Sequence, residues 1–261
     1  SPQSRGANSM SGTKGRWSRL WIDDFDMSTK TASAEISMSI GTEEVTAFQA
    51  TAKEFITTDP ESSIKITGYV SSLGADAGGW EQELYDRFAA TNVTQVGLML
   101  ADSATGDGGM PTYVLPLTSA DQMKISAPAT GVLGIDGSFM AGDYGLKRGV
   151  CLWYGAITGT GNKTSYDIGA AGSAGGDIYV WVFSITGSAT NASIKVQSAT
   201  TAGGSYSDEG TVTFSAVGAA TSAAMTGTVN QWLRVNVASM GGATGFTIAV
   251  VATVDGVTQP A

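Results

Sequence analysis

The chain has 261 residues, a formal net charge of −9, one cysteine and no histidine. One cysteine excludes a disulfide within the chain, and without histidine neither a Ser/His/Asp triad nor an ordinary zinc site can form. The acidic balance disfavours tight binding to nucleic-acid phosphates. A hydrophobic content of 42% together with 35 glycines is typical of a globular protein built from many short strands and glycine-rich turns. We therefore predict a mainly β protein.

Charge is distributed unevenly along the chain. Residues 1–19 carry four basic and no acidic residues, whereas residues 20–155 carry 7 basic and 18 acidic ones. Residues 1–15 lack periodicity, which predicts a flexible N-terminal arm that either docks on an acidic neighbour or stays solvated. The N-terminus lacks the apolar core of a signal peptide, and no stretch has the length of a membrane helix. We expect synthesis in a reducing cytoplasm and no membrane insertion.

Two strands with alternating polarity follow the first expected strand, Arg16–Ile22. In the first, apolar residues share one face: Ala34, Ile36, Met38 and Ile40, with Glu35, Ser37 and Ser39 opposite. In the second, apolar residues again share one face: Ile64, Ile66 and Val70, with Ser63, Lys65, Thr67 and Tyr69 opposite. Alternation with a period of two predicts a sheet with one packed face and one wet face.

A polar arm, Thr46–Ser62, separates these two strands. A long loop without structure of its own is uncommon in a compact domain unless it has a function. We predict that the arm contacts another subunit; the alternative is an exposed surface loop. The predicted inter-subunit residues are Phe48, Lys53, Phe55 and Ile56.

One helix is predicted over Trp80–Ala90, with an apolar stripe suited to packing on the back of a sheet. The stripe consists of Trp80, Leu84, Tyr85 and Phe88. Further strands are expected over 95–101, 112–118, 122–127 and 132–140, with Pro116 marking an edge or a bulge. Cys151, in the apolar run 150–154, is predicted to be a buried small hydrophobic residue.

No motif indicates a cofactor, a metal site or catalysis. Asp23, Asp24 and Asp26 lack the spacing of a calcium loop, which predicts a turn. The glycine-rich, acidic loop 102–110 could also bind calcium, but we interpret it as a hairpin turn. The run 159–164 resembles a phosphate loop but has Asn162 where that loop requires glycine. We therefore expect no cofactor and no enzymatic activity.

The second half of the chain is poor in charge and rich in small residues. Residues 156–176 are predicted to be a linker between a β domain at 16–155 and a second domain at 177–261. The second domain has five apolar strand patterns separated by turn residues, which favours a smaller, Ig-like β-sandwich. These patterns are 178–186, 192–200, 210–217, 231–238 and 246–254.

Several short motifs occur in the order found in one family of structural proteins. In the first half these are Asp26-Met27-Ser28, then the segment 43–48 (EEVTAF), then 64–69 (IKITGY), followed by the predicted helix. In the second half they are 178–187 (IYVWVFSITG), 194–199 (IKVQSA) and 232–235 (WLRV). With these motifs the chain resembles siphophage major tail (tail tube) proteins that carry a C-terminal β-sandwich.

The resemblance implies a two-sheet tail-tube-like β fold with one flanking helix, followed by the smaller sandwich. It also implies hexameric rings in which one sheet of each subunit joins a continuous barrel around a lumen. Rings would stack through the long loop and the N-terminal arm, and genomic DNA would pass through without tight binding. Under this reading, the wet face lines an acidic lumen with Glu35, Ser37, Thr67 and Asp136; the alternative register turns the other face inward.

The function implied is a structural virion protein of the phage tail, with other copies of itself and other tail proteins as partners. One alternative is a carbohydrate-binding or adhesive β-sandwich module, in which Trp153, Trp181 and Trp232 would form a sugar platform. Another alternative is a capsid decoration protein. An isolated tube protein should form rings or polymers, whereas a sugar-binding module should remain monomeric.

Overall fold

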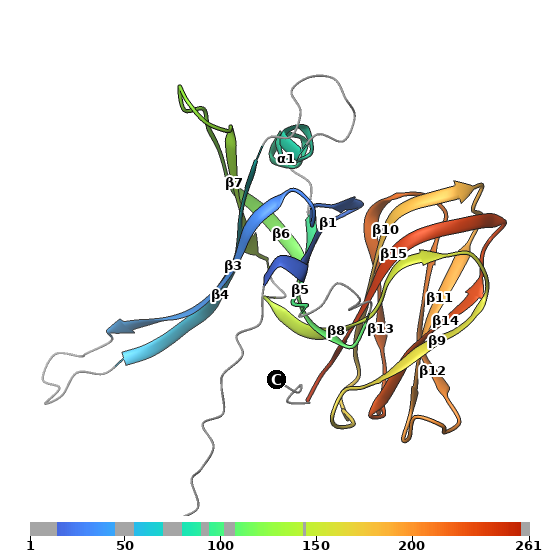
Figure 1. The fold of residues 1–261 in the computed structure, drawn as a ribbon. Helices are drawn as coiled ribbons and strands as arrows, with labels where there is room; N and C mark the ends of the chain where they lie inside the picture. Colours follow the sequence, from blue (N-terminus) through green and yellow to red (C-terminus); the bar gives the residue numbers. More distant parts are fainter. Residues whose placement is uncertain are drawn as a thin grey trace, which may run out of the picture.

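A computed structural model describes residues 15–44, 55–69, 80–89, 94–101, 108–142 and 145–256. These residues form two antiparallel β-sheets and one α-helix, which confirms the mainly β prediction (Figure 1). The same residues contain no helix that is both long enough and apolar enough to span a membrane.

The first half of the chain supplies one helix and seven strands to the described structure. In chain order the elements are η1 (Gly15–Trp17), β1 (Arg19–Ile22), β2 (Phe25–Asp26), β3 (Thr31–Glu44), β4 (Phe55–Tyr69), α1 (Trp80–Ala89), β5 (Thr94–Met99), β6 (Met110–Ser126) and β7 (Gly134–Ala141). The predicted helix is confirmed. The predicted bulge at Pro116 is also confirmed, because the register between β5 and β6 shifts between the pairs Val96–Leu115 and Thr94–Thr118.

Three predictions for the first half are wrong in detail. The predicted first strand begins with the 3₁₀ turn η1, so only residues 19–22 are extended. The strands predicted over 112–118 and 122–127 are a single strand, β6, because the bulge absorbs the proline without ending the strand. The second half of the predicted arm, residues 55–62, is not a loop, since β4 begins at Phe55 and pairs with the outer end of β3.

The second half supplies eight strands, β8 to β15. Their bounds are β8 (Lys147–Ile157), β9 (Gly161–Asp167), β10 (Gly176–Gly187), β11 (Ala192–Ala199), β12 (Ser207–Phe214), β13 (Gly218–Met225), β14 (Trp232–Ser239) and β15 (Ala243–Val254). The linker predicted at 156–176 is wrong for residues 161–167, which pair with β14 as strand β9. Its glycine, serine and threonine content suits an edge strand as well as a linker. Strand β13, rich in alanine, was not predicted.

The larger sheet has eleven strands and runs through both halves of the chain. One path through it is β13-β10-β15-β8-β6-β5-β1-β2, and a branch from β6 continues through β7 and β4 to β3. The smaller sheet has the order β12-β11-β14-β9 and packs on the C-terminal strands of the larger sheet. The two halves are therefore joined by the pairing of β6 with residues 147–151 of β8. The domain boundary predicted from the sequence, at residue 155, lies within this same strand.

The halves also share a buried aromatic cluster. Trp21 of β1 lies 5.3 Å from Trp181 of β10, between ring centroids, and 5.7 Å from Tyr154 of β8. Trp21 and Trp181 are fully buried, and so is Cys151, as predicted. Gly97 of β5 leaves room for the two indoles, because a Cβ there would lie 2.8 Å from Trp21 and 2.9 Å from Trp181.

We predict that Gly97→Ala destabilises the fold by about 1–3 kcal/mol, because an added methyl forces apart rings that cannot bend away. The measurement is the free energy of unfolding in denaturant. Gly159→Ala is the matched control, since a Cβ at Gly159 meets nothing within 4 Å. Equal stability of the two variants would contradict close packing at the junction.

Candidate functional site

The four residues predicted to line a lumen lie on one face of the branch β3-β4-β7-β6. In the strand register Glu35 lies opposite Lys65, Ser37 opposite Ser63, and Thr67 opposite Asp136. Partners in register project to the same side of a sheet, so the structure brings the predicted residues together on a single surface. We call this surface the polar face. Its polar members are Ser33, Glu35, Ser37, Ser39, Glu61, Ser63, Lys65, Thr67, Gln122, Lys124, Asp136 and Ser138, and the exposed Tyr69 and Met140 lie on the same side.

The opposite side of the branch is packed. Ile64, Ile66, Ile135 and Phe139 are fully buried there, and helix α1 covers them with Leu84 and its neighbours (Figure 1). The second predicted strand therefore has the packed and wet faces that its alternation predicts.

Two predictions for the packed side are wrong. Met38 and Ile40 are both 65% exposed, because the β3–β4 hairpin extends beyond the helix and core that cover its base (Figure 1). Tyr85 is 55% exposed, since it lies one position around the helix from Leu84, which faces the sheet. The side chain of Trp80 lies outside the described residues.

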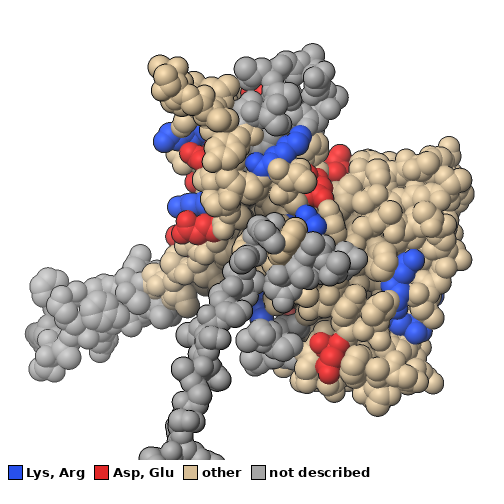
Figure 2. Space-filling view, viewed as in Figure 1, with Lys and Arg blue, Asp and Glu red and all other residues tan. Residues whose placement is uncertain are grey.

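The polar face carries both signs of charge. Glu35 faces Lys65, and Asp136 faces Lys124 on the neighbouring strand. Figure 2 shows basic and acidic side chains interleaved along this side of the molecule. Each of these two acids therefore has a lysine in register that offsets part of its charge. Glu61 lies opposite Ser39, so the face carries three acids and two lysines, and its role as an acidic lumen stays a prediction. Alternation identified the face, but the cross-strand partners depend on a register that the sequence does not reveal.

The two sides of the branch end in open strand edges. Among the described residues, β3 pairs only with β4, and residues 119–126 of β6 pair only with β7. Met38 and Ile40 are exposed at the first edge, on the packed side of the sheet. Ile125, which is 49% exposed at the second edge, lies in register with the buried Ile135 and thus on the same side.

The predicted inter-subunit residues fall largely beyond what the structure describes. Phe48 and Lys53 lie outside the described residues. Phe55 and Ile56 belong to β4, opposite Glu44 and Glu43, but their side chains are also outside the described part. Their predicted role stays a prediction.

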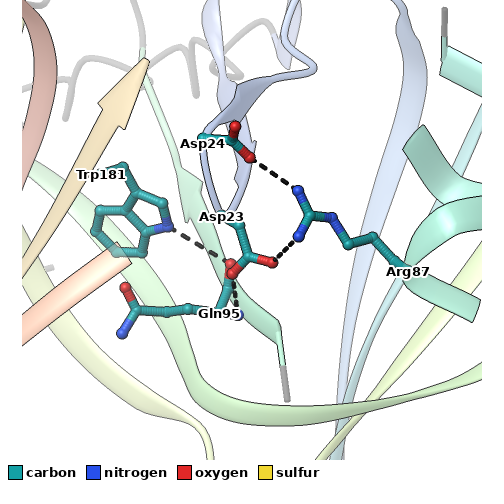
Figure 3. A network of polar contacts seen from close by, with 5 residues as sticks. All are labelled: Asp23, Asp24, Arg87, Gln95 and Trp181. Atoms are coloured by element: carbon teal, nitrogen blue, oxygen red, sulfur yellow. Dashed lines mark hydrogen bonds and ion pairs between the residues drawn. The ribbon is translucent and has the colours of Figure 1, made fainter. Parts of the chain in front are cut away.

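A polar network fixes helix α1 behind the polar face (Figure 3). The guanidinium of Arg87 contacts Asp23 at 2.9 Å and Asp24 at 2.8 Å, in the turn between β1 and β2. Asp23 also accepts a hydrogen bond of 2.8 Å from the backbone N–H of Gln95, and the Gln95 carbonyl accepts one of 3.5 Å from the Trp181 indole. One network thus links the helix, the turn, β5 and the second half.

Asp23 is the buried member of this network. It has a φ of 49°, which fits a tight turn, and it is 3% exposed. Burial raises the pKa of the Asp23 carboxyl above its ordinary 3.8, while the Gln95 N–H and Arg87 act in the opposite direction. Asp26 of β2 accepts hydrogen bonds from Ser28 and Tyr154, so all three of these acids make structural contacts. The described residues contain no group of three side chains arranged to hold a metal ion.

Comparison with known proteins finds no matching family model and no matching curated protein. Solved structures with some similarity include the virion of a native gene transfer agent particle, at 14% identity and a TM-score of 0.36, covering 52% of this chain and 98% of that one. A second is the sheath–tube complex of an extracellular contractile injection system, PVC, at 12% identity and a TM-score of 0.39, covering 57% and 98%.

A third is the Dit (gp 19.1) protein of SPP1, described as a hub adsorption apparatus of phages that infect Gram-positive bacteria. It is 12% identical, has a TM-score of 0.36, and covers 90% of this chain and 98% of its own. These similarities do not assign the chain to a family. The function proposed below rests on the sheet itself and on the sequence motifs.

We predict that Arg87→Met lowers the free energy of unfolding by about 3 kcal/mol at neutral pH, because Asp23 is left buried without its cation. A carboxyl with a raised pKa stabilises the fold below pH 3.8, and this stabilisation is lost as the pH rises through the folded-state pKa. Removing Arg87 raises that pKa further, so the deficit of the variant should grow with pH. Denaturant unfolding between pH 3 and pH 7 measures it, and a deficit independent of pH would contradict the assignment.

Proposed function

We propose that the chain is a structural subunit of a phage tail tube, in which copies join edge to edge into rings around a lumen. The observation that carries the proposal is the branch β3-β4-β7-β6, which has one polar face, one packed face and, among the described residues, an unpaired strand edge on each side. The motif resemblance to tail tube proteins points to the same arrangement. In this role the protein acts in the virion, with other tail proteins as partners.

The open edges suit one another. β3 is antiparallel to β4, β4 to β7, and β7 to β6, so β3 and β6 run in opposite directions. Pairing β3 of one copy with residues 119–126 of the next therefore continues the antiparallel order around a ring. An exposed edge strand of 14 residues otherwise invites aggregation, and closure of a barrel removes that hazard.

The same pairing would bury exposed apolar side chains. Met38 and Ile40 lie on the packed side of the sheet at one edge, and Ile125 lies on that side at the other. In a joined sheet they form one strip on the outside of the barrel, continuous with the core beneath α1. The polar face then lines the inside.

Six copies of a four-stranded branch give a wide barrel. With strands spaced about 4.8 Å apart and tilted by about 40°, twenty-four strands enclose a diameter of about 48 Å between backbones. Side chains do not fill a space of that width, so it holds water and a DNA duplex. Lysines paired with acids leave the face without a strong positive field, which lets phosphates pass without tight binding.

The alternative sugar platform lacks support. Trp181 is fully buried, while Trp153 and Trp232 are half-buried on strands of different sheets. They do not form one exposed aromatic surface.

We predict that Met38→Asp and Ile125→Asp each abolish ring and tube formation, because each places a charge in the proposed strip. Both residues are exposed in the isolated subunit, so the melting temperature should change by no more than about 2 °C. Electron microscopy and sedimentation of the purified chain measure assembly. Val217→Asp is the control, since Val217 is also exposed, at 40%, but lies in the second half. Tubes formed by Met38→Asp would contradict the proposed edge contact.

We predict that the pair Glu35→Lys and Asp136→Lys slows DNA ejection without changing tube length, because the polar face then becomes strongly basic and retains phosphates. The measurement is the rate of DNA release from particles assembled with the variant. Ser39→Lys, at the outer end of the same face, adds one positive charge and should have a smaller effect. Normal ejection from the double variant would contradict the placement of this face in the lumen.

A further inference from the structure

The outward face of the smaller sheet holds an arginine in a fixed position. The Nε of Arg234 on β14 donates a hydrogen bond of 2.9 Å to Oε1 of Gln197 on β11. Its guanidinium carbon lies 3.8 Å from the ring centroid of Tyr206, and the Tyr206 hydroxyl donates a 3.1 Å hydrogen bond to the carbonyl of Ala202. The guanidinium is thus held at one nitrogen and along one flat side.

In the described structure, no acidic side chain forms an ion pair with Arg234. Asp208 of β12 accepts hydrogen bonds from Nζ of Lys195 at 2.5 Å and from Nε2 of Gln197 at 2.6 Å. These contacts, that of Lys195 first, hold the pKa of Asp208 below its ordinary value, so it stays ionised and both its oxygens are occupied. They also orient the Gln197 amide with its oxygen toward Arg234. In the part of the chain that the structure describes, the two Nη groups of Arg234 have no hydrogen-bond partner.

The surroundings of this arginine offer amides and a hydroxyl. Ser165 of β9 lies opposite Arg234 in register, and Asn236 lies two residues further along the same face of β14. Asn236 donates a 2.6 Å hydrogen bond from Nδ2 to Oδ1 of Asn162. This pairing leaves the Asn162 amide nitrogen and the Asn236 amide oxygen available, one donor and one acceptor, as sugar hydroxyls require.

The face has no exposed aliphatic centre of the kind that protein interfaces bury. Protein interfaces are centred on buried aromatic or aliphatic anchors. Trp232, half-buried at one end of this face, is its one tryptophan among the described residues of the four strands, and none of the exposed large apolar side chains lies on β9, β11, β12 or β14. A polar, hydroxylated ligand fits this surface better than a protein does.

We propose that this face binds an acidic polysaccharide, with the two Nη groups of Arg234 holding the carboxylate of a uronate sugar and the Asn162–Asn236 pair binding its hydroxyls. A planar guanidinium fork matches the two coplanar oxygens of a carboxylate. Because Gln197 and Tyr206 already fix the Arg234 side chain, less conformational entropy is lost when a ligand binds. The chain's net charge of −9 opposes long polyanions, so each site is weak and gains from repetition along an assembled tail.

The probe is trigalacturonate, added to the full-length chain and followed by NMR through the Arg234 Nε–H signal and the Asn162 and Asn236 amides. We expect saturable binding that Arg234→Gln weakens at least about tenfold. Arg234→Lys keeps the charge but loses the fork, and it should weaken binding by a similar factor. Lys163→Gln is the matched control, because it removes the same charge from a side chain that lies over Trp153, outside this network; its affinity should stay within about twofold.

Several results would overturn the proposal. They are no saturable binding of trigalacturonate, equal binding of neutral maltotriose, equal binding of triglutamate, or equal loss in the Lys163→Gln variant. Melting curves confirm that each variant is folded. The outcome does not depend on tube formation, so this proposal and the proposed tube can fail separately.

Discussion

The alternation of side chains along β4 is the constraint on which the rest of the account depends. Ile64 and Ile66 point into a core covered by helix α1, so Lys65 and Thr67 must point to the other side. A slip of one residue would bury the lysine and expose both isoleucines, which the hydrophobic effect opposes strongly. The register then extends across β3, β7 and β6, and it places every member of the polar face on one side. The core beneath helix α1 therefore determines which side chains form the polar face.

The second constraint is the junction between the halves. Trp21 and Trp181 are buried against each other, and Gly97 leaves the space they need. The network of Arg87, Asp23 and Gln95 ties the helix to this same junction. Strand pairing between β6 and β8 adds a continuous backbone connection. In a ring, such a joint would hold the second half at a defined position relative to the sheet, with its own outward face available for a separate contact.

Sequence patterns predict the parts of this structure that depend on local chemistry. Alternation places Ile64 and Ile66 inward, the stripe of Leu84 and Phe88 predicts the helix, and the apolar run around Cys151 predicts a buried strand. Patterns do not show where a covered sheet ends, so Met38 and Ile40 were expected in the core although the helix does not reach them. Composition alone cannot separate a linker from an edge strand, which is why β9 was missed.

Contacts between residues that are distant in sequence could not be predicted from sequence patterns either. The lysines opposite Glu35 and Asp136 lie 30 and 12 residues away in sequence, and only the strand register brings them together. The network around Arg234 likewise joins three strands and a loop. Membership of the polar face was predictable from period-two alternation, whereas its balance of charge was not.

The central claim is that β3 and residues 119–126 are edges only in the isolated subunit. Amide hydrogen exchange on dissociated and assembled protein tests it most directly, since paired amides exchange slowly and free edge amides exchange quickly. The account predicts that assembly protects amides in both segments together, while exchange in β11 and β14 stays unchanged. Assembled particles in which both segments still exchange as quickly as in the monomer would contradict it.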